Sequence, residues 1–98
     1  MKLEKDILFL TIKRKWFDKI LSGKKTIEYR DVKKYYIDKF KEPLKYKKIL
    51  LQAGYSKNSP RLMADIEKIH IENVCIETNL FEFSNNYFCI YLKNVKSI

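Results

Sequence analysis

The sequence predicts an α+β fold, in one domain that spans residues 1–98. Its 98 residues are enough for one hydrophobic core and too few for two. Apolar residues make up 46% of the chain and aromatic residues 14%, a composition typical of a packed domain rather than a disordered one. Helical and strand-type patterns alternate early, whereas later segments show strand-type patterns only. We therefore expect two early helices and a mixed or antiparallel sheet, curled into a small barrel that hides its edges.

The first half of the chain predicts two strands, each followed by a helix. Residues 7–12 form a short apolar run that is typical of a buried strand. Residues 14–22 change to a helical period, and Gly23 follows where a left-handed residue ends a helix. Residues 25–31 alternate as a second strand, and residues 33–41 predict a second helix.

The same periods predict how the side chains of these elements are distributed. Asp31 is positioned to cap the second helix. In the second strand, Thr26, Glu28 and Arg30 share one side, and Ile27 and Tyr29 share the other. The helical periods predict inward-facing Trp16, Phe17, Ile20 and Leu21 from the first helix, and Tyr36, Ile37 and Phe40 from the second. Tyr35 is expected to pack the second helix as well.

The second half of the chain predicts strands joined by turns. The hydrophobic parity slips between Ile66 and Ile69, which indicates a bulge or bend near Glu67 and Lys68. The pattern predicts a strand at 47–53, an exposed loop at 54–60, a long strand at 61–73, a less regular connection at 77–86 and a closing strand at 87–92.

The positive charge is concentrated in the first half of the chain. The net charge is +9, and residues 1–48 hold 16 Lys/Arg against 7 Asp/Glu, whereas residues 49–98 hold five of each. A one-sided basic field attracts polyanions such as RNA or another single-stranded nucleic acid. A solvated lysine-rich surface without a partner is the alternative interpretation of the charge.

Cysteine and histidine usage predicts neither a metal site nor a cofactor. Cys75 and Cys89 both lie in apolar surroundings and are expected to be buried thiols. His70 is the only histidine and is expected to be structural, which leaves too few ligands for zinc. No apolar run approaches the roughly 20 residues of a membrane span, and no signal-type segment follows Met1. We expect a cytoplasmic protein that does not enter membranes.

The segment from Leu10 to Arg30 resembles the ASCH domain of the PUA-like superfamily. The family signature is G-x-K-x-x-E-x-R after an amphipathic helix that ends in Ile-Leu-Ser-Gly, and its four fixed positions correspond here to Gly23, Lys25, Glu28 and Arg30. The loop at 53–60 is similar to a Gly-Tyr loop of short ASCH proteins from phages and mobile elements. The similarity is strong over residues 7–31, partial over 49–72 and weak beyond.

The resemblance implies a PUA-like barrel with a cleft beside the first helix, lined by Lys25, Glu28 and Arg30. It also implies an RNA-related role, because PUA-like domains bind RNA and modified nucleosides. Some ASCH proteins are hydrolases, either ribonucleases or amidohydrolases of N4-acetylcytidine. The amidohydrolases carry Thr at the position of Glu28, so this chain departs from their pattern.

Side-chain chemistry assigns candidate roles within the motif. Lys25 and Glu28 are the candidate catalytic pair, with Glu28 as general base or as acceptor for a base amino group. Arg30 could hold a phosphate or carbonyl with two N–H groups, and Lys25 beside it is expected to have a lowered pKa. Lys24 offers charge for phosphates, and Tyr55 could stack on a base.

Two further lysines, Lys13 and Lys57, extend the candidate binding surface. Strict alternation puts Lys25 opposite Glu28 and Arg30, so a shared cleft requires an irregular strand start. The simplest alternative for Glu28 and Arg30 is a surface ion pair of little energetic value.

Three functions remain open from the sequence. The first is a module that binds RNA, single-stranded nucleic acid or a nucleotide. The second is a hydrolase acting on RNA or on a modified nucleoside such as an N4-acylcytidine. The third is a phage-related protein that acts through a protein partner. Oligomeric state does not follow from the sequence.

Overall fold

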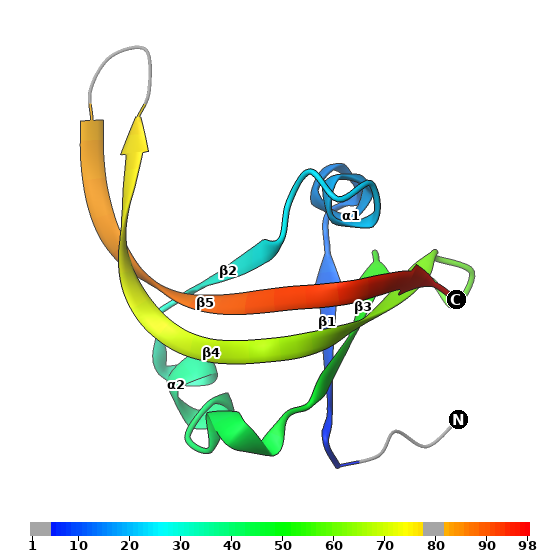
Figure 1. The fold of residues 1–98 in the computed structure, drawn as a ribbon, viewed down its shortest axis with the longest axis horizontal. Helices are drawn as coiled ribbons and strands as arrows, with labels where there is room; N and C mark the ends of the chain where they lie inside the picture. The colour runs from blue at the N-terminus through cyan, green and yellow to red at the C-terminus, as the bar shows by residue number, and fades with distance from the viewer. Residues whose placement is uncertain (1–4, 78–81) are drawn as a thin grey trace.

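The computed structural model describes residues 5–77 and 82–98. In chain order the elements are β1 (Ile7–Ile12), α1 (Arg14–Leu21), β2 (Ile27–Asp31), α2 (Lys34–Lys39), the 3₁₀ turn η1 (Pro43–Lys45), β3 (Lys48–Ala53), β4 (Arg61–Glu77) and β5 (Glu82–Ser97) (Figure 1). The α+β class and the predicted order of two early helices and five strands are confirmed. No helix in the described ranges is long and apolar enough to cross a membrane.

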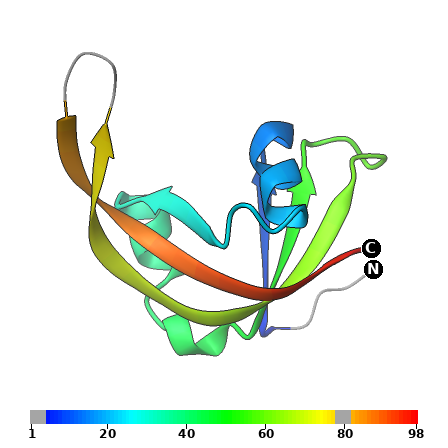
Figure 2. The same cartoon turned by 45° about the horizontal axis from the view of Figure 1, so that its top comes forward.

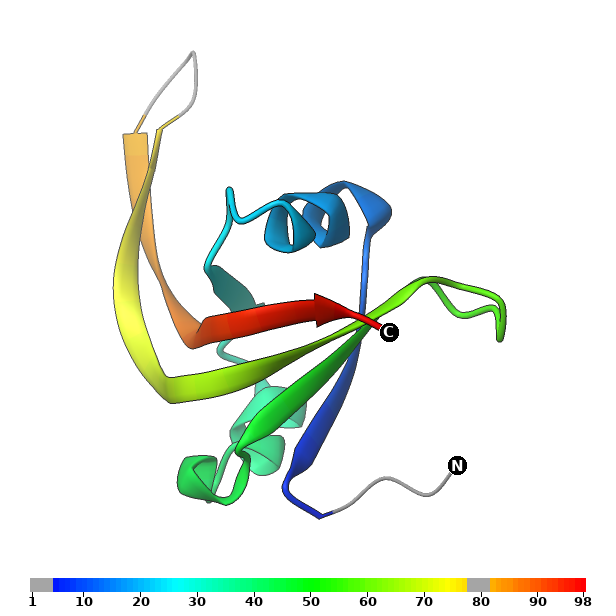
Figure 3. The same ribbon diagram turned by 45° about the vertical axis from the view of Figure 1, so that its right-hand side comes forward.

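The five strands form one mixed sheet in the order β1-β3-β4-β5-β2. β1 and β3 run parallel, and the other neighbours are antiparallel. Backbone pairing among the described residues does not close this sheet, so β1 and β2 are its two edges. Because β1 and β3 are parallel, their C-terminal ends lie at the same end of the pair. α1 follows β1 at this end, whereas α2 and η1 precede β3 at the opposite end (Figures 2 and 3).

The core lies between the sheet and the inner faces of α1 and α2. Phe17 and Ile20 are the buried residues of α1, and Phe40 follows α2 and packs against Phe88 with ring centroids 5.0 Å apart. The strands contribute Leu8, Leu10, Ile12, Ile49, Leu51, Leu62, Ala64, Ile69, Ile90 and Leu92. Burial of this apolar area is the main force that holds β2 and α1 in place around the pocket described below.

β4 and β5 form a long hairpin that bends away from the sheet (Figure 1). The register shifts between Ile66 and Lys68, which confirms the predicted bulge. Residues 73–77 and 82–86 pair only with each other in the described chain. The predicted irregular connection is therefore wrong for 82–86, while 78–81 lie outside the described residues. A ribbon of two strands has no core to face, so its sequence lacks a hydrophobic period.

Several predicted burials are wrong. Trp16, Leu21 and Ile37 are exposed, because α1 buries only Phe17 and Ile20 and α2 buries no residue within its bounds. Cys75 is exposed in the two-stranded part of the hairpin, whereas Cys89 is buried as predicted. The N-cap of α2 is Lys33 and makes no side-chain cap hydrogen bond, so Asp31 does not cap this helix.

Candidate functional site

The turn between α1 and β2 brings Lys25 to the same side as Glu28. Gly23 takes the predicted left-handed conformation with φ of +83°, and the backbone N–H of Lys25 donates to the carbonyl of Lys19 at 3.0 Å. The strand begins only at Ile27, so strand alternation does not constrain Lys25. The structure therefore has the irregular strand start that a shared cleft requires, and the Nζ of Lys25 lies 3.6 Å from Glu28 Oε1.

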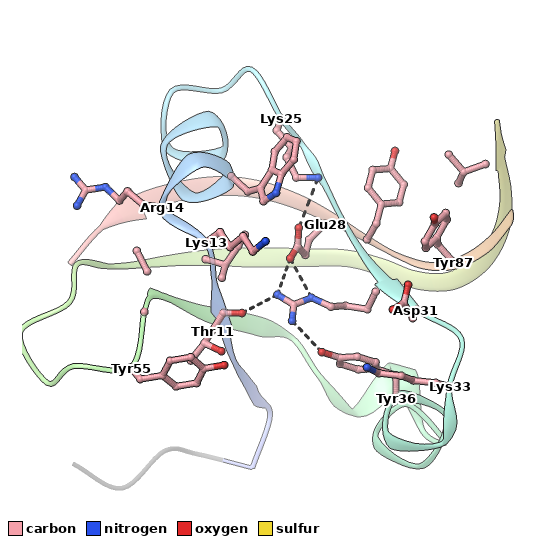
Figure 4. A pocket seen from close by; sticks show the side chains of 17 residues that line it. Thr11, Lys13, Arg14, Lys25, Glu28, Asp31, Lys33, Tyr36, Tyr55 and Tyr87 are labelled. Atoms are coloured by element: carbon pink, nitrogen blue, oxygen red, sulfur yellow. Dashed lines mark hydrogen bonds and ion pairs between the residues drawn. The ribbon is translucent and has the colours of Figure 1, made fainter. Parts of the chain in front are cut away.

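Glu28 is a buried carboxylate held by Arg30. Its residue is 5% exposed, and its Oε2 accepts hydrogen bonds from Arg30 Nε at 3.0 Å and Arg30 Nη2 at 2.6 Å (Figure 4). Because this ion pair is buried, it differs from exposed ion pairs, which contribute little to stability. Glu28 Oε1 accepts no hydrogen bond from any described residue, with Lys25 as its nearest cation.

Arg30 connects β2 to two other elements. Its Nη2 donates to the backbone carbonyl of Thr11 in β1 at 2.9 Å, and its Nη1 donates to the hydroxyl of Tyr36 in α2 at 2.9 Å (Figure 4). Four of the five N–H groups of this guanidinium are thus directed at protein acceptors. Arg30 therefore positions Glu28 and bridges the two edge strands, and it has no open fork for a phosphate.

Burial and charge shift the pKa values of both cations. Burial lowers the pKa of Lys25, against the opposing effect of the Glu28 carboxylate. The predicted direction is confirmed, although burial contributes more than the neighbouring Arg30. Burial alone would lower the pKa of Arg30, but Glu28 and Tyr36 raise it overall. Arg30 therefore remains charged, and Lys25 is the more easily deprotonated of the two.

These residues lie in an open pocket of about 960 Å³, close to the upper end of the size range of ligand sites. The pocket is bounded by the end of β1, the start of α1, β2, the loop after β3 and the β4–β5 hairpin. Of the predicted site residues, it brings together Lys13, Lys25, Glu28, Arg30 and Tyr55 (Figure 4). Lys24 and Lys57 do not line it.

Sequence reasoning missed most of the aromatic lining. Trp16 and Tyr29 are 39% and 38% exposed, and the Nζ of Lys25 lies 5.7 Å and 4.6 Å from their ring centroids. Tyr36 and Tyr87 also line the pocket. The helical period assigned Trp16 and Tyr36 to the core, and no local pattern distinguished Tyr87. The missed charged lining residues are Asp31 and Lys33.

Tyr55 stands on a loop that a buried glutamine holds in shape. Gln52 is 5% exposed, and its Nε2 donates to the carbonyls of Gly54 at 2.7 Å and Ser56 at 3.3 Å. Its Oε1 accepts a hydrogen bond from Arg61 Nε at 2.8 Å. The ring of Tyr55 is nevertheless 90% exposed at the pocket rim. The loop therefore holds the Tyr55 ring at the rim of the pocket and leaves the ring open to solvent.

The arrangement combines one buried acceptor, a cation of lowered pKa and partly exposed rings. Among the described residues no group of three or more His, Cys, Asp or Glu could hold a metal ion. No protein-family model, curated protein or solved structure matches the chain. The chemistry of the pocket suits a flat polar ligand with N–H donors and negative charge.

Proposed function

We propose that this chain is a nucleotide- or RNA-binding domain of the ASCH type. In this proposal a nucleobase enters the pocket, donates an amino N–H to Glu28 and stacks on the exposed rings. The exposed rim cations Lys13 and Lys33 attract the phosphate. Arg30 keeps the carboxylate of Glu28 in place and does not itself contact the ligand.

The proposal includes the PUA-like barrel as its fold. The five-strand mixed sheet leaves β1 and β2 as edges, and the Arg30 side chain links them through the carbonyl of Thr11. In a PUA-like barrel this is where the sheet would close. The ASCH signature at Gly23, Lys25, Glu28 and Arg30 supports the same assignment, because a left-handed turn and an ion-paired cluster occupy those positions.

The observation that carries the proposal is the Oε1 atom of Glu28, which faces the Nζ of Lys25 at 3.6 Å but accepts no hydrogen bond within the described residues. A buried carboxylate that receives two hydrogen bonds on Oε2 and none on Oε1 has unused acceptor capacity. Buried polar groups in proteins are nearly always satisfied, by protein, water or ligand. An amino group of cytosine or guanine would satisfy Oε1, whereas the corresponding edge of uracil presents a carbonyl that Glu28 would repel.

The test is a comparison of CMP, GMP and UMP by isothermal titration calorimetry at low salt. We expect CMP or GMP to bind at least tenfold more tightly than UMP, because uracil carries a carbonyl in place of the amino group that donates to the Glu28 carboxylate. Glu28→Gln should remove this preference. Glu42→Gln is the matched control, because Glu42 is exposed and lies outside the pocket. Equal binding of all three nucleotides, or binding of none, would refute the proposal.

Hydrolysis is a second candidate function, favoured by the pairing of Lys25 with Glu28. An amine with a lowered pKa lies 3.6 Å from a carboxylate inside a pocket, an arrangement suited to activating water or protonating a leaving group. Candidate substrates are RNA and an N4-acylcytidine. Lys25→Met keeps an unbranched side chain beside the rings of Trp16 and Tyr29 and removes the amine. Catalysis is supported if the wild type and Lys24→Met turn over a substrate and Lys25→Met does not. If the wild type turns over neither substrate, catalysis on these substrates is excluded.

A further inference from the structure

An aromatic surface continues from the pocket over one face of β2, β5 and β4. Tyr29 pairs with Cys89, and Cys89 pairs with His70, so these three residues form one row across the sheet. Because alternate residues share a face, Tyr87 and Tyr91 flank Cys89 on the same side. We call Tyr29, Tyr87, Tyr91 and His70 the aromatic face.

Ring contacts join the four residues of this face in two pairs. The ring centroids of Tyr29 and Tyr87 lie 6.1 Å apart, and those of His70 and Tyr91 lie 5.4 Å apart, both edge to face. Glu72 holds the second pair, since its Oε2 accepts the Tyr91 hydroxyl and its Oε1 lies 3.0 Å from His70 Nε2. The rings are therefore restrained by the sheet, and Tyr29 is 38% exposed while the other three are partly exposed.

The aromatic face meets the pocket at the edge strand β2, where Tyr29 lies on the opposite side of the strand from Glu28. Tyr29 and Tyr87 belong to both, whereas His70 and Tyr91 lie beyond the pocket lining. The Nζ of the exposed Lys68 lies 4.4 Å from the Tyr91 ring, which places a cation at the far end of the surface. The carboxylate of Glu72 on this face is already engaged by Tyr91 and His70. Stacking rings beside a positive charge are the features with which proteins bind successive bases of a single strand.

We propose that the chain binds a single-stranded RNA of several nucleotides rather than one nucleotide. One base occupies the pocket at Glu28, and the bases that follow stack on the aromatic face toward His70 and Tyr91. This inference rests on the proposed function and adds a second binding surface to it. Free nucleotides would use the pocket alone.

The experiment measures the binding of labelled hexacytidylate by fluorescence anisotropy. Competition with unlabelled CMP gives the affinity for the single nucleotide. We expect the wild type to bind the hexamer at least tenfold more tightly than CMP. His70→Ala and Tyr91→Ala should each weaken hexamer binding by about fivefold or more and leave CMP binding unchanged. Tyr35→Ala is the control, because Tyr35 is an exposed tyrosine of α2 outside the pocket and the aromatic face.

A measurement on the wild type covers the case in which a variant does not fold. In an NMR titration, the ring protons of His70 and Tyr91 should shift with the hexamer and not with CMP. Equal affinity for the hexamer and CMP, or unshifted His70 and Tyr91 signals in the hexamer complex, would overturn this inference and leave the proposed function standing. Absence of binding by both ligands would overturn this inference, and absence of GMP binding as well would overturn the proposed function.

Discussion

Glu28 and Arg30 are the side chains on which the geometry of the pocket depends. A carboxylate buried to this extent is tolerated because a cation and several hydrogen bonds accompany it. The same hydrogen bonds make Arg30 a link between β2, the carbonyl of Thr11 and the hydroxyl of Tyr36. Loss of Glu28 would therefore leave Arg30 without its carboxylate partner, and loss of Arg30 would leave Glu28 with Lys25 alone, at 3.6 Å.

We expect Arg30→Ala to lower the free energy of unfolding by about 3–5 kcal/mol, since Glu28 would stay buried without its partner. Chemical denaturation monitored by circular dichroism measures this change. Arg14→Ala is the control, because the Arg14–Asp18 pair is more than half exposed on both sides and contributes about 0–1 kcal/mol. Equal effects of the two substitutions would show that the Glu28–Arg30 pair contributes no more than an exposed one.

At the scale of elements, the β4–β5 hairpin supplies both the far wall of the pocket and the aromatic face. Its bulge between Ile66 and Lys68 changes which residues of β4 face the core. Cross-strand contacts then connect the two strands on the outer face, most directly through Glu72 and Tyr91. This contact also determines the acid–base behaviour of Glu72.

The pKa of Glu72 is lowered from an ordinary 4.5 to about 2, mainly by the hydrogen bond from Tyr91, then by Cys89 and to a smaller extent by His70. A lowered carboxyl pKa stabilises the fold above pH 4.5, and this contribution is lost as the pH falls toward 2. Tyr91→Phe should raise the pKa of Glu72 toward 4.5 and flatten the pH dependence of stability between these limits. NMR titration of the Glu72 carboxyl measures this pKa. Tyr35→Phe should leave it unchanged, and an unaltered Glu72 titration in Tyr91→Phe would contradict the assignment.

At the scale of the whole molecule, the uneven distribution of charge is matched by the position of the pocket. The half of the chain that carries the net charge of +9 also supplies most of the lining, including the cations Lys13, Arg14, Lys25, Arg30 and Lys33. Two of these, Lys25 and Arg30, are engaged with Glu28. The exposed rim cations are therefore the ones available to phosphates.

The salt dependence of RNA binding should report these rim cations. For a single strand, each phosphate contact contributes about −0.7 to the slope of log affinity against log salt concentration. We expect Lys13→Ala to make the slope shallower by about that amount, because Lys13 lines the pocket. Lys57→Ala, an exposed lysine outside the pocket lining, should keep the wild-type slope. Identical slopes for both variants would argue that Lys13 does not contact phosphate.

The sequence by itself determined the α+β class, the order of helices and strands, the turn at Gly23, the bulge after Ile66 and the shared side of Glu28 and Arg30. These features follow from local periodicity and from residues with restricted backbone conformations. The tertiary structure alone decided how the strand start brings Lys25 to Glu28, that Arg30 is occupied by protein acceptors, and that Trp16 and Tyr87 border the pocket. Such features depend on contacts between segments far apart in the chain, and hydrophobic patterning does not encode which apolar side chain remains at a pocket rim.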